Sequence, residues 1–472
     1  ILYLISRYGT YGLQFIVSMV IATKLGPYYL GVYGFITLLI TYFSQINLGI
    51  PHSLNVLIVH NKSNKQKCDS YINNSIVIYT IVSLIVITMF LFIAITEISI
   101  SDKFPLTTFH CFLISIIAIT QYYSSLCSTI LRVSNRVNQL AIAQSSLVLF
   151  NLSAIFFFNG ETLIYVLMIC QLMNLLVYIF LTWHEKLIPN ICNFRISWNL
   201  QKEILHKGFY LFFYNSCFYF ILISIRTIIS SNYTVEEFGL FNFSYTLGHA
   251  VLLCIEALTM IIFPKIIDLL SSKNYKKIEQ TISTIRISFV STSHLLVYIA
   301  LLFFPLIIAL VSKFNDAQAS MNLIALSILM NTNSYGYSSF LIAQNKEKIS
   351  ARISFIALII NIVFAEILIQ IFHVGFSHVS IAIMITYFFF SMMAVAESKK
   401  VMGTFSWKST LKGFMPIRLL IPYLTALYIS INEYQNLIFI PLFLFIILNI
   451  NDIKAMYNIG IKLIKNPNIT DI

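Results

Sequence analysis

The chain is poor in charge for its length. Only 10% of its 472 residues are charged and 58% are hydrophobic, whereas a soluble globular domain carries roughly 25% charged residues. Glycine and proline are also scarce, at 15 and 10 residues, which excludes collagen-like repeats and long Gly/Pro-rich linkers. The composition therefore excludes an ordinary water-soluble protein.

Motifs of several enzyme classes are absent as well. The sequence has no Gly-x-x-x-x-Gly-Lys-Ser/Thr, no Gly-x-Ser-x-Gly, no His-Glu-x-x-His and no Asp-x-Asp, so it gives no sign of an ATP-driven step, a serine hydrolase, a zinc protease or a metal-dependent glycosyltransferase. Its 7 cysteines form no Cys-x-x-Cys pair and no cluster with metal-ligand spacing. We expect no enzymatic activity, no cofactor and no metal.

What the sequence has in abundance is long apolar runs, and its mean hydropathy is +0.84. A helix of about 20 apolar residues spans the core of a bilayer. Runs of this kind predict an all-α polytopic membrane protein with about 14 transmembrane helices. The spans are 1–23, 29–51, 74–95, 108–130, 140–158, 163–183, 208–230, 239–263, 285–311, 320–343, 353–372, 377–396, 417–431 and 436–448. Pro422 and Pro441 interrupt the last two, so 12 spans remain an alternative.

The basic charge is distributed unevenly. A net charge of +12 is compatible with nucleic-acid binding, but most Lys and Arg residues fall in alternate connections. Lys62, Lys65 and Lys67 follow the second span, for example, and Lys346 and Lys348 follow the tenth. This is the asymmetry of the positive-inside rule. It predicts a multi-pass protein of a bacterial cytoplasmic (inner) membrane with both termini in the cytoplasm, and no nucleic-acid partner.

Two apolar runs carry matching polar stripes. The first stripe consists of Arg7, Tyr11, Gln14 and Ser18. The second consists of Asn215, Tyr219 and Arg226. An offset of 208 residues places Asn215 over Arg7, Tyr219 over Tyr11 and Arg226 over Ser18. The spacings place most members of each stripe on one helix face.

Further matches extend this internal repeat. Gly31 lies over Gly239 at the same offset, and at an offset of 210 Asn135-Arg136 lies over Asn345-Lys346 and Asn151 over Asn361. Each copy holds six spans, an even number, so the copies enter the membrane in the same direction, as parallel repeats do. We expect an N-terminal lobe (1–183), a cytoplasmic linker (184–207), a C-terminal lobe (208–397), a second linker (398–416), two further helices (417–448) and a cytoplasmic tail (449–472).

The two arginines inside apolar spans are the first candidates for function. A charge within a membrane helix is costly and marks a functional site by default. One interpretation is that Arg7 and Arg226 reach for the nearer head-group layer. The other is that both face a water-filled cavity and hold an anion, because the planar guanidinium binds two phosphate oxygens. Tyr11 and Tyr219 would then line the same path.

Two carboxylates, one of them with a histidine on the same helix face, allow two interpretations each. Glu256 and His249 lie seven residues apart on one face of the eighth span, and Glu366 lies in the eleventh. Each carboxylate either balances the charge of an arginine or couples transport to protons or sodium. The sequence leaves both roles open.

At this point the chain resembles the Wzx-type polysaccharide flippases of the multidrug/oligosaccharidyl-lipid/polysaccharide (MOP) exporter superfamily. The resemblance covers the whole chain in topology, and its motifs are concentrated in the first sixty residues. These motifs are Ser6-Arg7-Tyr8-Gly9, Ala22-Thr23-Lys24-Leu25-Gly26, Gly31-Val32-Tyr33-Gly34 and Asn47-Leu48-Gly49-Ile50.

The resemblance implies two six-helix lobes forming a V, with two peripheral helices. It implies that an undecaprenyl-pyrophosphate-linked oligosaccharide, the O-antigen repeat unit of lipopolysaccharide biosynthesis, moves from the cytoplasmic to the external leaflet. It also implies a cationic cavity, onto which Arg7 and Arg226 map. A polysaccharide polymerase and a chain-length regulator are the implied protein partners.

We therefore expect a flippase that works by alternating access, driven by an ion gradient or the membrane potential. Three alternatives remain open. They are a multidrug exporter of the same superfamily, a peptidoglycan-precursor flippase and a membrane polysaccharide polymerase. The multidrug exporter is disfavoured because a carrier of cations should present carboxylates, whereas both stripes carry arginine.

Overall fold

The structure is a computed structural model that describes residues 2–61, 64–96, 102–189, 196–207, 209–272 and 274–465. Every element in these ranges is a helix, and each predicted span falls mainly on helical residues. The predicted span 320–343 is divided by a turn between Thr332 and Tyr337, and the span 29–51 by a turn at Leu48 and Gly49. Nine helices of the described residues are long and apolar enough to cross a membrane, or up to 11 if each of two bent pairs counts as one span. The predicted all-α membrane fold is confirmed.

The chain divides into two compact units. Unit 1 comprises Ile1–Ser216 and Thr234–Gly239, and unit 2 comprises Cys217–Tyr233 and Leu240–Ile472. The helix α8 (Phe209–Asn232) contributes its first residues to unit 1 and the rest to unit 2. Each unit is described by itself below.

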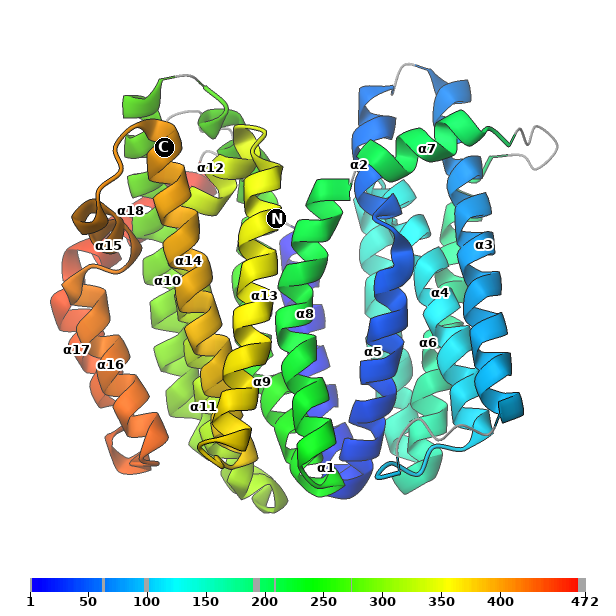
Figure 1. The fold of residues 1–472 in the computed structure, drawn as a ribbon, viewed down its shortest axis with the longest axis horizontal. Helices are drawn as coiled ribbons and strands as arrows, with labels where there is room; N and C mark the ends of the chain where they lie inside the picture. Colours follow the sequence, from blue (N-terminus) through cyan, green and yellow to red (C-terminus); the bar gives the residue numbers. More distant parts are fainter. Residues whose placement is uncertain are drawn as a thin grey trace. The chain divides into compact units, whose positions relative to one another are not determined.

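Unit 1 is built on six long helical spans. Its first helix, α1, holds two of them, because Gly26 adopts a left-handed φ of 70° that breaks the helix and Pro27 begins the next. Proline suits the first turn of a helix, where its missing N–H is no loss. The helices of unit 1 before α8 are α1 (Leu2–Ser44), α2 (Ile50–His60), α3 (Lys65–Thr96), α4 (Thr108–Val133), α5 (Val137–Phe157), α6 (Gly160–His184) and α7 (Trp198–Lys207) (Figure 1).

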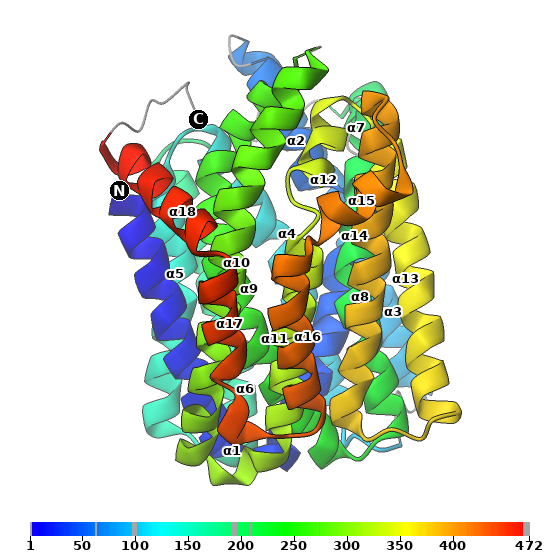
Figure 2. The same cartoon turned by 90° about the vertical axis from the view of Figure 1, so that its left-hand side faces the viewer.

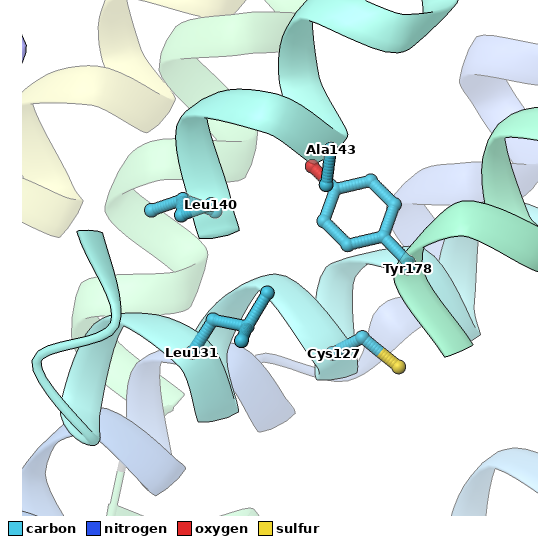
Figure 3. Packing of buried hydrophobic residues seen from close by; sticks show 5 residues of the cluster. All are labelled: Cys127, Leu131, Leu140, Ala143 and Tyr178. Atoms are coloured by element: carbon cyan, nitrogen blue, oxygen red, sulfur yellow. The ribbon is translucent and has the colours of Figure 1, made fainter. Parts of the chain in front are cut away.

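A small apolar core joins three of these helices. Cys127 and Leu131 of α4, Leu140 and Ala143 of α5 and Tyr178 of α6 are all buried together (Figure 3). The cluster lies beside the short turn between α4 and α5. The alanine and the leucines allow close helix packing there, which fixes the ends of all three helices.

Unit 2 continues the helical pattern. It contains most of α8 and of α9 (Val235–Leu270), and its remaining helices run in chain order to the end of the described residues. These are α10 (Tyr275–Leu310), η3 (Ser312–Ala317), α11 (Gln318–Thr332), α12 (Tyr337–Ala343), α13 (Glu347–Gln370), η4 (Phe376–Ser380), α14 (Ile381–Met402), α15 (Trp407–Phe414), α16 (Ile417–Ile431), η5 (Gln435–Leu437), α17 (Ile440–Leu448) and α18 (Ile450–Lys465).

The last helices of unit 2 cover one of its sides. α16 and α17 pack on each other, α16 packs on α11, and α17 and α18 pack on α10 (Figure 2). The Arg418 guanidinium on α16 bonds the Asp452 carboxylate on α18, with an N···O distance of 2.7 Å. These contacts anchor the C-terminal helices to unit 2.

Matching turns support the internal repeat. Asn135 after α4 and Asn345 after α12 both adopt a left-handed φ, of 58° and 55°. In each turn the next residue donates its N–H to a carbonyl five residues back, from Arg136 to Leu131 and from Lys346 to Leu341. This is the Schellman ending of a helix, for which asparagine is suited. The pair predicted as equivalent from the sequence thus forms the same local structure.

A reciprocal contact between glycines in unit 1 supports the repeat independently. A Cβ atom placed on Gly31 would lie 2.1 Å from the carbonyl oxygen of Val235, and one placed on Gly239 would lie 1.8 Å from that of Pro27. Pro27 and Val235 are themselves equivalent at the offset of 208. Within unit 1, the segment around Gly31 and the first turn of α9 therefore contact each other through equivalent residues in exchanged roles.

Candidate functional site

The arginine of the second stripe is buried inside an apolar helix. Arg226 lies in α8, within a span of 21 residues that is apolar enough to cross a membrane, and only 8% of its surface is exposed. Isoleucines occupy both neighbouring turns of this helix, including Ile225 and Ile229, which are fully buried. The Arg226 guanidinium is therefore enclosed by unit 2, and its orientation is set by the side chains around it.

Two side chains of α9 hold the Arg226 guanidinium. Its Nε–H donates to Oδ1 of Asn242 at 3.1 Å in a buried hydrogen bond. Its central carbon lies 5.2 Å from the ring centroid of Tyr245, which is within the range of a cation–π interaction. Both of these groups are neutral, and together they orient the guanidinium. An Nε–H fixed in this way sets the plane in which the terminal amino groups lie, the geometry that suits bidentate contact with a phosphate.

The polar face of α9 continues past this pair. The ring of His249 stacks on that of Tyr245 at a centroid distance of 5.4 Å. Asn242, Tyr245 and His249 follow one another at spacings of three and four, so they lie on one helix face. Gly248 lets α9 approach α11, because a Cβ there would lie 2.9 Å from a side-chain carbon of Ile324. The site is thus a polar face within unit 2, made by α8 and α9.

The first stripe lies in α1, in unit 1. Tyr11 and Ser18 are half-buried and Gln14 is exposed. Arg7 also falls in α1, but its side chain lies outside the described residues. Thr10 of α1 shares a hydrogen bond of 2.7 Å with Ser145 of α5. This part of α1 is therefore tied to α5 next to the predicted stripe.

The residues of the second stripe fall in different units. Asn215 belongs to unit 1, where its Nδ2 lies 3.4 Å from Nε2 of His52 on α2. Tyr219 belongs to unit 2 and is 41% exposed, seven residues before Arg226 on the same helix. The stripe therefore does not form a single cluster.

The three predicted coupling residues, Glu256, Glu366 and His249, lie on two helices, α9 and α13. The side chain of Glu256 on α9 lies outside the described residues. Glu366 lies on α13 and is half-buried. His249 is the member of this group that the structure places beside the arginine site, through its contact with Tyr245.

Sequence reasoning missed Asn242 and Tyr245. Their signal is a polar face within an otherwise apolar span, at the same helical spacing that identified the first two stripes. A polar face of this kind can be assigned a role only when the helix packed against it is known. Here a short turn joins α8 to α9 and places the two helices side by side (Figure 1).

A comparison with protein families identifies the group to which the chain belongs. The family described as polysaccharide biosynthesis protein matches residues 1–270, which is more than half of the chain. No curated protein matches it.

Solved structures share the fold at low sequence identity. The inward-facing conformation of a multidrug resistance MATE family transporter of the MOP superfamily is similar with a TM-score of 0.69 and 13% identity, over 85% of this chain and 98% of that one. The lipid II flippase MurJ in its inward closed conformation is similar with a TM-score of 0.68 and 12% identity, over 98% of this chain and 99% of that one. Identities this low show a shared fold and do not carry a function.

The family match and the fold agree with the resemblance that the first sixty residues carry. The chain belongs to the family of polysaccharide biosynthesis proteins, and its fold is that of transporters of the MOP superfamily.

Proposed function

We propose that the protein is a flippase that moves an undecaprenyl-pyrophosphate-linked oligosaccharide, an O-antigen repeat unit, from the cytoplasmic to the external leaflet of a bacterial inner membrane. It works by alternating access and is driven by an ion gradient or the membrane potential. Membership of the polysaccharide biosynthesis family supports the substrate class. The fold, shared with a MATE transporter and with MurJ, supports transport in preference to catalysis.

The observation that carries the proposal is the buried arginine of α8. Arg226 is buried inside a membrane-length helix and is oriented by Asn242 and Tyr245. A pyrophosphate carries the negative charge and the paired oxygens that a guanidinium binds best. An arginine at this position favours an anionic cargo over a cationic one, because like charges repel.

The remaining stripe residues complete the proposed path. Arg7 would attract the pyrophosphate near the cytoplasmic end, and Arg226 would receive it near the external end. Tyr11, Gln14 and Ser18 would line the path in the first repeat, and Asn215 and Tyr219 would line it in the second. Hydroxyl and amide groups of this kind both donate and accept hydrogen bonds, as sugar hydroxyls require.

The test is complementation in a strain that lacks the gene, with surface O-antigen as the measurement. Arg226→Ala should abolish display at a normal protein level, and Arg226→Lys should restore only part of it, because lysine keeps the charge but not the planar fork. Arg352→Ala is the matched control. The Arg352 side chain is 64% exposed, and its ion pair with Glu397 is long at 3.9 Å, so its loss should have little effect. Full display by Arg226→Ala would remove this arginine from the mechanism.

The coupling residues require a separate experiment. The rate at which a lipid-linked oligosaccharide moves between the two leaflets of proteoliposomes is measured with and without a proton gradient. Glu366→Gln and His249→Asn, made separately, identify which group carries the coupling, because the responsible variant loses the effect of the gradient and keeps the basal rate. Equal responses in both variants and the wild type would leave Glu256 as the remaining candidate among the three.

A further inference from the structure

A cavity of about 290 Å³ lies at one end of unit 2, away from the arginine site. Its walls come from η3, the first turns of α11, η4, the last turn of α16 and the segment around η5. These segments meet at the lower ends of α11 and α16 in Figure 2. None of the stripe or coupling residues lines it.

The walls of this cavity are held by hydrogen bonds between elements. Ser320 of α11 and Ser380 of η4 share a buried bond of 3.2 Å. Ser244 of α9 donates its hydroxyl to the carbonyl oxygen of Ala317, at the end of η3, at 2.7 Å. The cavity is therefore largely formed before any ligand arrives, as is usual for small-molecule sites.

Three of the lining residues carry a buried polar atom without a hydrogen-bond partner among the described residues. These atoms are Nε2 of Gln318, Oδ1 of Asn322 and Oγ of Ser430. The three residues are only 6%, 5% and 1% exposed. A buried polar group left unpaired costs about 1–3 kcal/mol, so a small rotation of these side chains toward a hydrogen-bonding occupant would be favourable.

The charge of the lining restricts what that occupant is. Asp316 and Glu433 are acidic and exposed at the edge of the cavity, and none of the residues that line it is basic. A phosphate or carboxylate would therefore be repelled. The described residues hold no group of three His, Cys, Asp or Glu side chains arranged to bind a metal ion.

We propose that this cavity binds a single neutral sugar ring. Sugar hydroxyls both donate and accept hydrogen bonds, and they match the amides of Gln318 and Asn322, the hydroxyl of Ser430 and the carboxylates of Asp316 and Glu433. The buried ring of Phe376 supplies an apolar surface for the C–H face of the sugar. The volume lies near the lower end of the roughly 300–1,000 Å³ range of ligand pockets, which suits one sugar unit better than an oligosaccharide.

The role of this site in transport rests on the proposed function. The distribution of basic residues predicts that the η3 end of α10 faces outward, so the cavity would hold a sugar of the exported oligosaccharide on the release side. Binding of a free sugar, however, does not depend on transport. The two proposals can therefore fail separately.

The experiment measures binding of free sugars to the full chain, purified in a detergent without a sugar headgroup. Saturation-transfer NMR is recorded with glucose, galactose and N-acetylglucosamine as probes, and a titration gives the affinity of each. At least one probe should receive saturation from the wild-type protein. Transfer to none of the three would overturn the proposal.

Two variants locate the site. Asn322→Leu removes the unpaired oxygen at nearly constant size, and Glu433→Asn removes a carboxylate at a position of left-handed φ, 56°, which asparagine adopts readily. Each should weaken binding by about tenfold, the loss expected from one hydrogen bond to a buried or charged group. Lys313→Gln, an exposed change in η3, should leave the affinity unchanged.

The outcomes are distinct. Binding that survives unchanged in both variants would place the sugar elsewhere and refute the proposal. Should Glu433→Asn fail to fold, Asn322→Leu alone decides. If sugars bind as expected but the protein complements no loss of O-antigen export, the sugar site stands and the proposed function fails.

Discussion

Two arginines of unit 2 each donate to an oxygen atom and lie over an aromatic ring. Arg226 shows this with Asn242 and Tyr245, and Arg286 shows it in a second place. The Arg286 guanidinium donates to the backbone oxygens of Asn333 and Phe414, the latter at 3.0 Å, and lies 5.2 Å from the ring centroid of Tyr337. One side chain thus ties α10 to the turn after α11 and to the end of α15.

We predict that Arg286→Lys lowers the stability of unit 2. A lysine ammonium is a single point and does not reach two carbonyls as the guanidinium fork does. Losing one charged hydrogen bond should cost about 1.5–3 kcal/mol. Thermal unfolding in detergent checks this, with Arg352→Lys as the exposed control. An unfolding temperature equal to that of the control would contradict the structural role.

Asn242 should matter mainly through its hydrogen bond to Arg226. We predict that Asn242→Leu reduces surface O-antigen several-fold, since it frees the plane of the guanidinium without removing its charge. In an Arg226→Lys background, which retains part of the display but has no Nε–H for Asn242 to accept, the same change should have little additional effect, because residues in contact are coupled. Equal effects in both backgrounds would show that Asn242 acts independently of the arginine.

At the scale of helices, the close approach of α1 and α9 is the most demanding packing feature. The carbonyl oxygens of Pro27 and Val235 occupy the space that side chains of Gly239 and Gly31 would need. Only glycine permits two backbones to come this close. This packing explains why glycines recur at equivalent positions of the two copies.

We predict that Gly239→Val prevents the protein from accumulating in the membrane. Its Cβ would lie 1.8 Å from the Pro27 oxygen, a clash that backbone atoms relieve only by moving the helix ends apart. Gly375→Ala is the control, because a Cβ at Gly375 meets nothing within 4 Å and its φ is −66°. Membrane content by immunoblot is the measurement. Equal amounts of both variants would mean that the helices tolerate separation.

A smaller loss of stability is expected for a substitution in the left-handed turn at Asn345. Asn345→Val should destabilise the end of α12 by about 1–2 kcal/mol, because a β-branched residue is strained at a φ of 55°. Asn345→Gly should leave the unfolding temperature unchanged or raise it slightly. If valine and glycine gave the same temperature, the turn would not be limiting stability.

At the scale of the whole molecule, the distribution of charge predicts its orientation. Lys276 and Lys313 are exposed and lie near opposite ends of α10. In a background without reactive native thiols, Lys313→Cys should react with a membrane-impermeant maleimide in intact cells. Lys276→Cys should react only after the membrane is opened. If Lys276→Cys reacted in intact cells and Lys313→Cys did not, the predicted orientation in the membrane would be wrong.

The sequence predicted the helices well, and it pointed to Arg226 but not to the side chains that hold it. Apolar runs fix membrane helices because every backbone polar group must be satisfied within the segment. Arg226 was predictable because a charge within such a run is rare. Its partner Asn242 was not, since a polar residue in α9 gains its role only from the helix beside it. The sugar cavity gave no signal, because its lining comes from segments more than a hundred residues apart.

The reciprocal glycine contact also limits how the chain can be repaired after a change. Gly31 and Gly239 each face a backbone carbonyl oxygen, that of Val235 and that of Pro27. A side chain introduced at either glycine cannot be accommodated by shortening a partner side chain, because the partner is a backbone group. We therefore expect second-site suppressors of Gly239→Val in the backbone around Gly26 and Pro27, and not among the side chains that surround the contact.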